Sequence, residues 1–165
     1  MKVSTTRFGD ISIDKTRIIE MKEGMLGFEH LKRYVLLTQD KETPFMWFQS
    51  VDDGSLAFVV IHSFVVKDDY EPVISDSDVR LLDIPSSPAP EDIVVLSTVT
   101  IRSDPFRVTA NLRAPIVINA RKMLAKQVVL MEDEYPVQYP LTVNQTALEK
   151  KAAEKGTIAP TPLAP

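Results

Sequence analysis

The chain has 165 residues, of which 44% are hydrophobic and 25% are charged, and its formal net charge is −4. This length and composition are typical of one globular domain with a hydrophobic core. The sequence has no cysteine, which excludes disulfides and thiolate chemistry, and the negative net charge argues against a protein that tracks nucleic-acid phosphates.

The N-terminus and the apolar runs predict a soluble protein. Residues 1–7 contain a lysine but no apolar stretch after it, so no secretory signal is expected. The longest apolar run, residues 56–61, is far shorter than the roughly 20 residues that span a bilayer. We therefore expect a cytoplasmic protein without membrane association.

The first half of the chain is dominated by alternating and β-branched residues, which favour strands. Turn signals separate these strands, among them Gly9 and the Asp-Asp-Gly-Ser sequence at 52–55. Glycines interrupt the pattern at 23–31, where we expect a loop with a short helical turn over 28–32. The predicted strands are residues 2–6, 10–14, 17–21, 34–38, 45–50 and 56–63.

The second half begins with an irregular stretch over 65–79. Within it, Tyr70-Glu71-Pro72 predicts a loop or a sheet edge, because proline cannot donate to a central ladder. Residues 75–84 fit either one capped helix or a short strand, and the prolines of 85–90 mark a connector. The strand at 93–101 is apolar on both sides, which predicts a central position in a sheet. Further strands are expected at 107–112, 116–119 and 126–131.

Many short strands with turn signals predict a mostly β fold, a small closed or partly open β-barrel-like single domain with short helical turns. We place this domain at residues 1–141, and the tail at 142–165 differs from it in composition. A helix is expected at 145–155, where alanine alternates with glutamate and lysine. Gly156 ends that helix, and the proline-rich segment 157–165 is expected to be disordered.

The sequence contains no recognisable catalytic, metal or cofactor motif. The two histidines, His30 and His62, stand far apart and outside any metal-ligand spacing, and each is expected at the surface or an edge. His62 and Ser63 are consecutive, so on a strand they would face opposite ways, which argues against a nucleophilic pair. Asp83 lies between apolar neighbours, and we expect it to be a capping or edge residue.

Two features are candidates for binding another protein. The four residues from Phe45 to Phe48 are all apolar, so either both sides of this strand are covered or one side forms an exposed interface. Eight acidic residues lie between Lys67 and Asp92, with Lys67 and Arg80 as the only cations. Such a stretch is either a set of solvated loops or a surface that steers a basic partner.

Several motifs, taken together, resemble the FliW family of flagellar assembly factors over about residues 1–141. The most specific is Asn-Leu-Arg-Ala-Pro-Ile-Val-Ile-Asn at 111–119, in which Asn111 and Asn119 flank the break at Pro115 and can bond to turn backbone. The resemblance also includes the stretches 24–28, 44–50, 56–60, 70–72, 108–110 and 127–130.

The resemblance implies a small, mostly β cytoplasmic protein without enzymatic activity, cofactor or direct nucleic-acid binding, and monomeric when free. Members of the family bind flagellin, and they bind CsrA, a small dimeric RNA-binding protein that represses translation of flagellin mRNA. The two partners are expected to exclude each other. Accumulating flagellin therefore occupies the protein and frees CsrA. When flagellin is exported, the protein binds CsrA again.

The resemblance and the acidic stretch together suggest where CsrA would bind. An RNA-binding regulator tends to be basic, so the carboxylates around Tyr70 are expected to approach it. The candidate partner-binding residues of this segment are Asp68, Asp69, Tyr70 and Glu71. Negative charge held near an RNA site would also repel phosphate over about 8 Å in physiological salt.

An apolar terminal segment of flagellin would need a groove lined by residues such as Met46, Phe48 or Phe64. Two other interpretations compete with a binding switch. An acid-dependent hydrolase on a β-barrel would require a deep pocket with two carboxylates about 5–10 Å apart. A ligand-binding β module for nucleic acid or sugar would require a basic or aromatic face.

Overall fold

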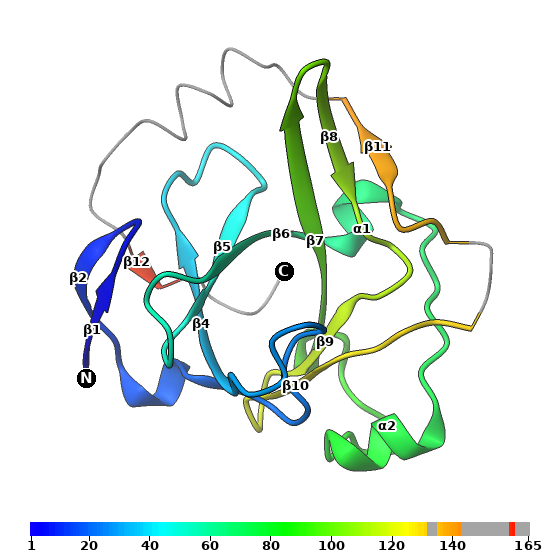
Figure 1. Cartoon of the computed structure of the whole chain (residues 1–165). Coiled ribbons are helices and arrows are strands. Elements are labelled where there is room, and N and C mark those ends of the chain that lie inside the picture. The colour runs from blue at the N-terminus through cyan, green and yellow to red at the C-terminus, as the bar shows by residue number, and fades with distance from the viewer. Residues whose placement is uncertain (132–134, 143–158, 161–165) are drawn as a thin grey trace.

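The computed structural model describes residues 1–131, 135–142 and 159–160, and seven of the described strands form a closed barrel (Figure 1). The barrel strands are β3 (Ile19–Met21), β4 (Arg33–Thr38), β5 (Met46–Ser50), β6 (Ala57–His62), β7 (Ile93–Ser103), β9 (Ile116–Asn119) and β10 (Leu124–Gln127). They follow one another in the order β7-β6-β5-β4-β3-β10-β9, and the ring closes because β9 also pairs with β7. The predicted mostly β, barrel-like fold is confirmed.

The long strand β7 extends beyond the barrel and forms part of a second sheet. Its first half pairs with β9 and β6, whereas its second half pairs with β8 (Phe106–Ala110), which in turn pairs with β11 (Tyr139–Leu141). In Figure 1 the β7–β8 hairpin rises above the barrel with β11 beside it. We call β8, β11 and the second half of β7 the extension sheet. The central position predicted for this strand is confirmed.

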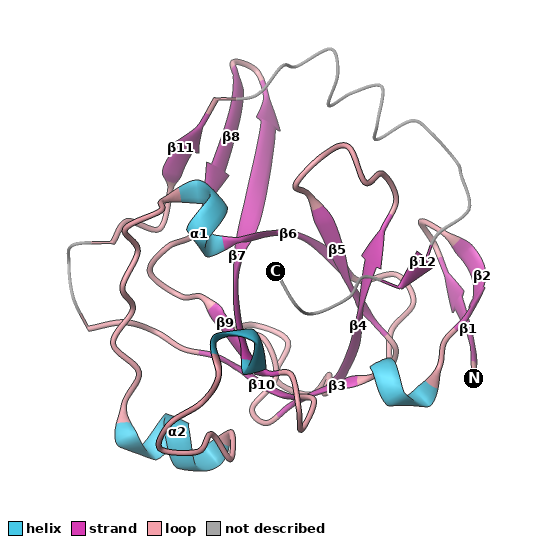
Figure 2. Cartoon of the chain, turned by 180° about the vertical axis from the view of Figure 1, so that it is seen from behind, coloured by secondary structure: helices cyan, strands magenta, loops and turns pink. Residues whose placement is uncertain are grey.

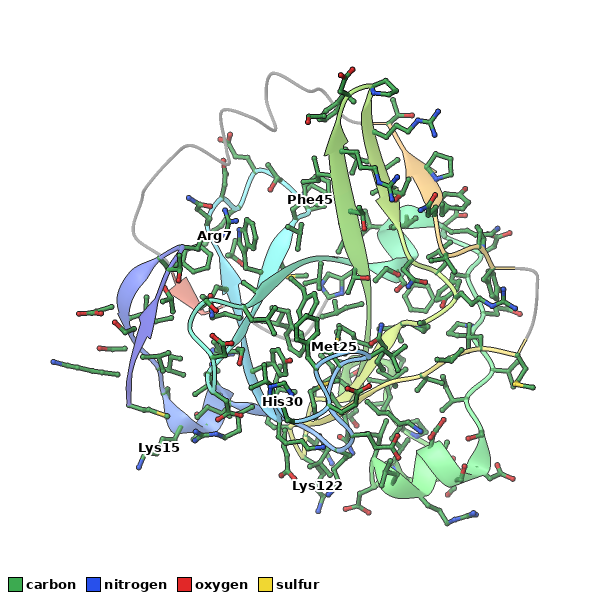
Figure 3. The ribbon with its side chains drawn as sticks, viewed as in Figure 1. Arg7, Lys15, Met25, His30, Phe45 and Lys122 are labelled. Atoms are coloured by element: carbon green, nitrogen blue, oxygen red, sulfur yellow. The ribbon has the colours of Figure 1, made fainter. Side chains whose placement is uncertain are left out.

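Alternate side chains of the barrel strands fill the interior. Tyr34 of β4 and Phe48 of β5 are fully buried there and stack with their ring centroids 4.5 Å apart. Leu96 of β7 and Ile116 of β9 are equally buried in the same core. Met25, labelled in Figure 3, enters this core from the loop after β3. The interior is therefore packed with side chains, as expected of a small barrel.

Other layers cover the outside of the barrel. The hairpin of β1 (Lys2–Thr5) and β2 (Gly9–Ser12) packs Val3 against Val35 and Leu37 of β4. Next to it, the Arg7 guanidinium lies 4.1 Å from the Trp47 ring centroid. The helical elements are η1 (Lys15–Arg17), α1 (Ser63–Val66), α2 (Asp76–Leu81) and η2 (Pro90–Asp92) (Figure 2).

Helix α2 settles the ambiguous prediction for 75–84 in favour of a capped helix. The Ser75 hydroxyl accepts a hydrogen bond from the Asp78 amide at 3.2 Å and caps its N-terminus. Asp83 follows the helix with a φ of 55°, and the next amide, of Ile84, donates to the Val79 carbonyl at 3.0 Å. Asp83 thus lies in the turn that caps the C-terminus of α2, which confirms the predicted capping position.

The strand predicted at 126–131 is wrong in its bounds. β10 ends at Gln127, and the chain continues alongside the 113–115 segment. There the Val128 amide donates to the Pro115 carbonyl, and the Leu130 amide donates to the Arg113 carbonyl. Proline has no N–H to return a bond, so a full ladder cannot form there.

Two further predictions concern the loop after β3 and the C-terminal tail. The short turn predicted at 28–32 is present as a single hydrogen-bonded turn, in which the Leu31 amide donates to the Phe28 carbonyl at 3.0 Å. β12 (Ala159–Pro160) pairs with the end of β4, which β3 leaves unpaired, although disorder was expected there. The helix predicted at 145–155 lies outside the described residues.

Candidate protein-binding surface

Helix α1 displays two apolar side chains on the outside of the barrel. The chain leaves β6 at His62, and the next residue, Ser63, is buried with its hydroxyl hydrogen-bonded to that of Ser97 at 2.7 Å. One helical turn follows, in which the next two side chains point outward, and Phe64 is 49% and Val65 61% exposed. We call the exposed residues of α1 and the loop after it the α1 surface. Its members are Phe64, Val65, Asp68, Asp69 and Glu71.

Tyr70 anchors this loop to the body of the protein. It is 1% exposed, and its hydroxyl donates to the Leu112 carbonyl at 2.6 Å. Its ring packs edge-on against Tyr135, with centroids 4.6 Å apart, and the Tyr135 hydroxyl accepts from the Glu71 amide at 3.0 Å. Burial raises the pKa of Tyr70, so its phenol stays protonated and remains a donor. The prediction that Tyr70 contacts a partner is therefore wrong, because this buried residue positions the α1 surface instead.

The carboxylates of the α1 surface differ in their local pairing. Lys67 and Asp69 form an ion pair at 2.5 Å, and this hydrogen bond lowers the pKa of the Asp69 carboxyl and raises that of the Lys67 ammonium. Asp68 and Glu71 are exposed and form no ion pair with any described residue. These two carboxylates provide the unpaired negative charge of the surface.

Ion pairs also compensate much of the acidic stretch that follows. Asp78 binds Lys126 at 2.5 Å, and Asp83 lies 3.3 Å from Lys122. Asp92 lies 3.2 Å from the Arg121 Nε atom. The negative field is consequently weaker than the eight acidic residues of the sequence suggest, and its uncompensated part includes Asp68 and Glu71.

Met46 and Phe48 do not belong to this surface. Met46 is 5% exposed and Phe48 is 0% exposed, and both lie in the barrel core. The predicted groove that combines them with Phe64 is therefore wrong. Of the alternatives for this strand, coverage on both sides is correct, because Phe45 packs against the extension sheet and Trp47 against the β1–β2 hairpin.

Val65 is the one exposed apolar neighbour of Phe64 that sequence reasoning missed. A continuing strand would place Phe64 and Val65 on opposite sides, whereas the helical turn exposes both. The only sequence feature that points to the exposure of Val65 is the apolar run directly after Ser63, and a buried strand would explain that run equally well.

The most specific motif of the sequence has an architectural role. The Asn111 side-chain oxygen accepts from the Arg113 and Ala114 amides, each at 3.0 Å. The Asn119 amide group donates to the Leu82 and Asp83 carbonyls at 2.9 and 3.1 Å, which ties the end of α2 to the barrel. Both asparagines therefore fix turn backbone, as predicted.

The geometry provides little support for catalysis. One cleft of about 510 Å³ lies on the extension sheet, and none of its lining residues is acidic. A second, of about 640 Å³, lies near the N-terminus with Glu20 as its only carboxylate. Neither holds the pair of carboxylates that a hydrolase of the expected type would need.

The two histidines lie outside the lining of both clefts. Burial lowers the pKa of His62, and His30 lies exposed on the loop after β3 (Figure 3).

The described residues also contain neither a group of metal ligands nor a membrane-spanning helix. There, no three histidine, cysteine or acidic side chains come together in a group that could hold a metal ion. No helix in the described parts of the chain is both long and apolar enough to cross a membrane.

Comparisons with known proteins agree with the fold. The family model described as FliW protein matches residues 2–141. A flagellar assembly factor FliW from Syntrophus aciditrophicus is 50% identical over 90% of this chain and 92% of its own length. The corresponding protein from Geobacter sulfurreducens is 40% identical over 94% of both chains. A crystal structure of a flagellar assembly factor FliW superimposes with a TM-score of 0.76 at 34% identity and covers 88% of this chain and 99% of its own. The chain therefore belongs to the FliW family of flagellar assembly factors.

Proposed function

We propose that this protein is a cytoplasmic, non-enzymatic regulator that binds CsrA and flagellin in a mutually exclusive switch. While it holds CsrA, flagellin mRNA is translated, and accumulating flagellin displaces CsrA and stops synthesis. The observation that supports this proposal best is the α1 surface, where exposed apolar and uncompensated acidic side chains lie within one short segment. Phe64 and Asp68 represent these two kinds of side chain.

The two kinds of side chain suit different partners. Asp68 and Glu71 can steer a basic RNA-binding protein toward the surface. Phe64 and Val65 provide an apolar contact of the kind that receives the nonpolar face of a partner helix. Because Phe64 and Glu71 are only a few residues apart, two macromolecules that use them would overlap. Steric overlap on one anchored loop is thus a sufficient cause of mutual exclusion.

The test is calorimetric titration of the purified protein with CsrA from the same organism, alone and then saturated with flagellin. We expect binding that flagellin abolishes. Binding of CsrA that persists at saturating flagellin would refute mutual exclusion. If the folded protein bound neither partner, the proposed regulator would be ruled out.

A variant of the two exposed apolar residues of α1 tests their contact with flagellin. Replacing Phe64 and Val65 by alanine is expected to weaken flagellin binding by at least tenfold, since exposed aromatic anchors often dominate such interfaces. Replacing the exposed Val137, which lies outside the α1 surface, by alanine is the matched control and should leave the affinity unchanged. Full flagellin affinity in a folded Phe64→Ala/Val65→Ala variant would remove α1 from the proposed site.

A further inference from the structure

Two arginines face each other on the outer face of the extension sheet. In the register of β7 and β8, Arg102 is directly opposite Arg107. Side chains alternate along a strand, so this pair points away from the face that carries Val99 and Val108. The apolar face packs with Ile61 of β6, on the barrel side of the sheet. Phe45, labelled in Figure 3, packs against the same apolar cluster.

The arginines line the cleft of about 510 Å³ that spans β8 and β11. Further polar groups come from Thr109, Gln138 and Thr142, whose side chains can donate hydrogen bonds. Apolar lining comes from residues such as Pro140, which is directly opposite Thr109 in the register of β11 and β8. The volume falls in the range of roughly 300–1,000 Å³ that is typical of sites for whole ligands. The cleft therefore offers donors, positive charge and apolar surface together.

No acidic side chain among the described residues pairs with the two arginines of this cleft. Like charges directly opposite each other destabilise a pair of strands. Some other cations of the protein do have an acidic partner, as in the contact between Arg33 and Asp52 at 2.7 Å. Within the described parts of the chain, neither Arg102 nor Arg107 forms an ion pair. A bound anion would offset the repulsion, and the planar guanidinium groups suit bidentate contacts with carboxylates.

We propose that this cleft binds an extended acidic segment of a partner protein, with two of its carboxylates on Arg102 and Arg107. The segment would lie across the sheet and would not extend it, because Pro140 in β11 lacks the N–H that strand addition needs at an edge. A nucleic acid is less suited, because a net charge of −4 repels a polyphosphate.

This site is separate from the proposed CsrA and flagellin switch. Val66 of α1 packs with Val99 on the barrel side of the extension sheet, whereas the arginines occupy the opposite face. An acidic segment in the cleft could therefore bind while the α1 surface is occupied. The proposal does not depend on which partners that surface takes.

The test uses two capped eight-residue peptides and the full chain in a nitrogen-15 NMR titration at low and physiological salt. One peptide alternates glutamate with alanine, and the other replaces each glutamate by glutamine. We expect the acidic peptide to shift the amide signals of Thr109 and Gln138 and to bind at least tenfold more tightly than its neutral counterpart. Equal affinity of the two peptides, or no binding by either, would overturn the proposal.

Variants then assign the binding to the arginine pair. Arg102→Gln with Arg107→Gln should weaken binding of the acidic peptide by at least tenfold. Arg80→Gln with Lys2→Gln removes the same charge from exposed positions elsewhere and should change the affinity less than twofold. Equal loss in both variants would assign the effect to net charge alone and overturn the site. Tighter binding of an eight-nucleotide uridine RNA than of the acidic peptide would replace the proposed partner by a nucleic acid.

A charge reversal separates binding from folding. In Arg107→Glu the repulsive pair becomes an attractive one with Arg102, so the Tm should stay the same or rise by up to about 4 °C. The same variant should lose binding of the acidic peptide. A lower Tm would contradict the uncompensated repulsion from which the proposal starts, and retained binding would contradict the role of the pair.

Discussion

The two uncompensated carboxylates of the α1 surface should control how fast a basic partner associates. The perturbation is Asp68→Asn with Glu71→Gln, which removes two negative charges from side chains that form no described ion pair. The control is Lys67→Gln with Asp69→Asn, which removes an ion pair and leaves the net charge unchanged. Both variants alter two exposed or half-buried side chains of the same loop, so any general effect on the loop is shared.

The expected magnitude follows from Coulomb's law. A cation of the partner about 8 Å from one carboxylate in water gains about 0.5 kcal/mol, so two carboxylates contribute about 1 kcal/mol, or about fivefold in association rate. At 10 mM salt the screening length is about 30 Å, and this effect should be seen nearly in full. At 150 mM the screening length is about 8 Å, which reduces the effect to about twofold.

Stopped-flow association kinetics with CsrA at these two salt concentrations would measure the effect. We expect Asp68→Asn/Glu71→Gln to slow association about fivefold at low salt, and the Lys67→Gln/Asp69→Asn control to change it less than twofold. If both variants slowed association equally, specific contacts or loop disorder would be responsible, and the steering argument would fail. It would also fail if the first variant had no effect at 10 mM salt.

Three further predictions concern the groups that hold the functional surface in place. Tyr70→Phe leaves the Leu112 carbonyl without its donor and should lower the free energy of unfolding by about 1–3 kcal/mol in urea titrations; no change would refute the anchoring role. Asn119→Ala removes the bonds that tie α2 to the barrel, so amide exchange in α2 should accelerate more than in β5. Hydrogen bonding to Asp78 raises the pKa of Lys126 above 10.5, so this pair stabilises the fold at neutral pH and the contribution is lost as pH rises through the raised pKa. Above about pH 10.5 wild type should therefore lose stability more steeply than Lys126→Met, and parallel curves would contradict the coupling.

Local sequence patterns predicted the barrel strands well because their signals are carried within each segment. The stretch at 93–101 is apolar on both sides, and β7 accordingly has neighbours on both edges and cores on both faces. The pair of asparagines at 111 and 119 likewise signalled turns through their own side chains. These predictions required no knowledge of distant parts of the chain.

Features that depend on distant partners could not be predicted in this way. β11 contains Pro140 and has no strand pattern of its own, and it becomes a strand only because it pairs with β8. Met46 and Phe48 could equally have lined a groove or the core, and only closure of the ring decides between these positions. The candidate site was therefore right in the loop that contains Asp68 and wrong where it relied on barrel residues.

The extension sheet separates surfaces of opposite charge, and the electrostatic coupling between them gives a last prediction. The α1 surface and the Arg102–Arg107 pair lie on opposite sides of one packed layer, a separation on the order of 20 Å once the outward side chains are added to the roughly 10 Å between packed layers. At 10 mM salt the screening length of about 30 Å exceeds this separation, so the arginines partly cancel the attraction that Asp68 and Glu71 exert on a basic partner.

Arg102→Gln with Arg107→Gln should accordingly speed association of CsrA at 10 mM salt by a few-fold. At 150 mM the screening length of about 8 Å is shorter than the separation, and the same variant should have almost no effect. Arg80→Gln with Lys2→Gln controls for net charge, and a comparable acceleration by that variant would show that only the total charge matters. An acceleration that persisted at 150 mM salt would mean that the arginines contact the partner directly, which would place the cleft inside the CsrA interface.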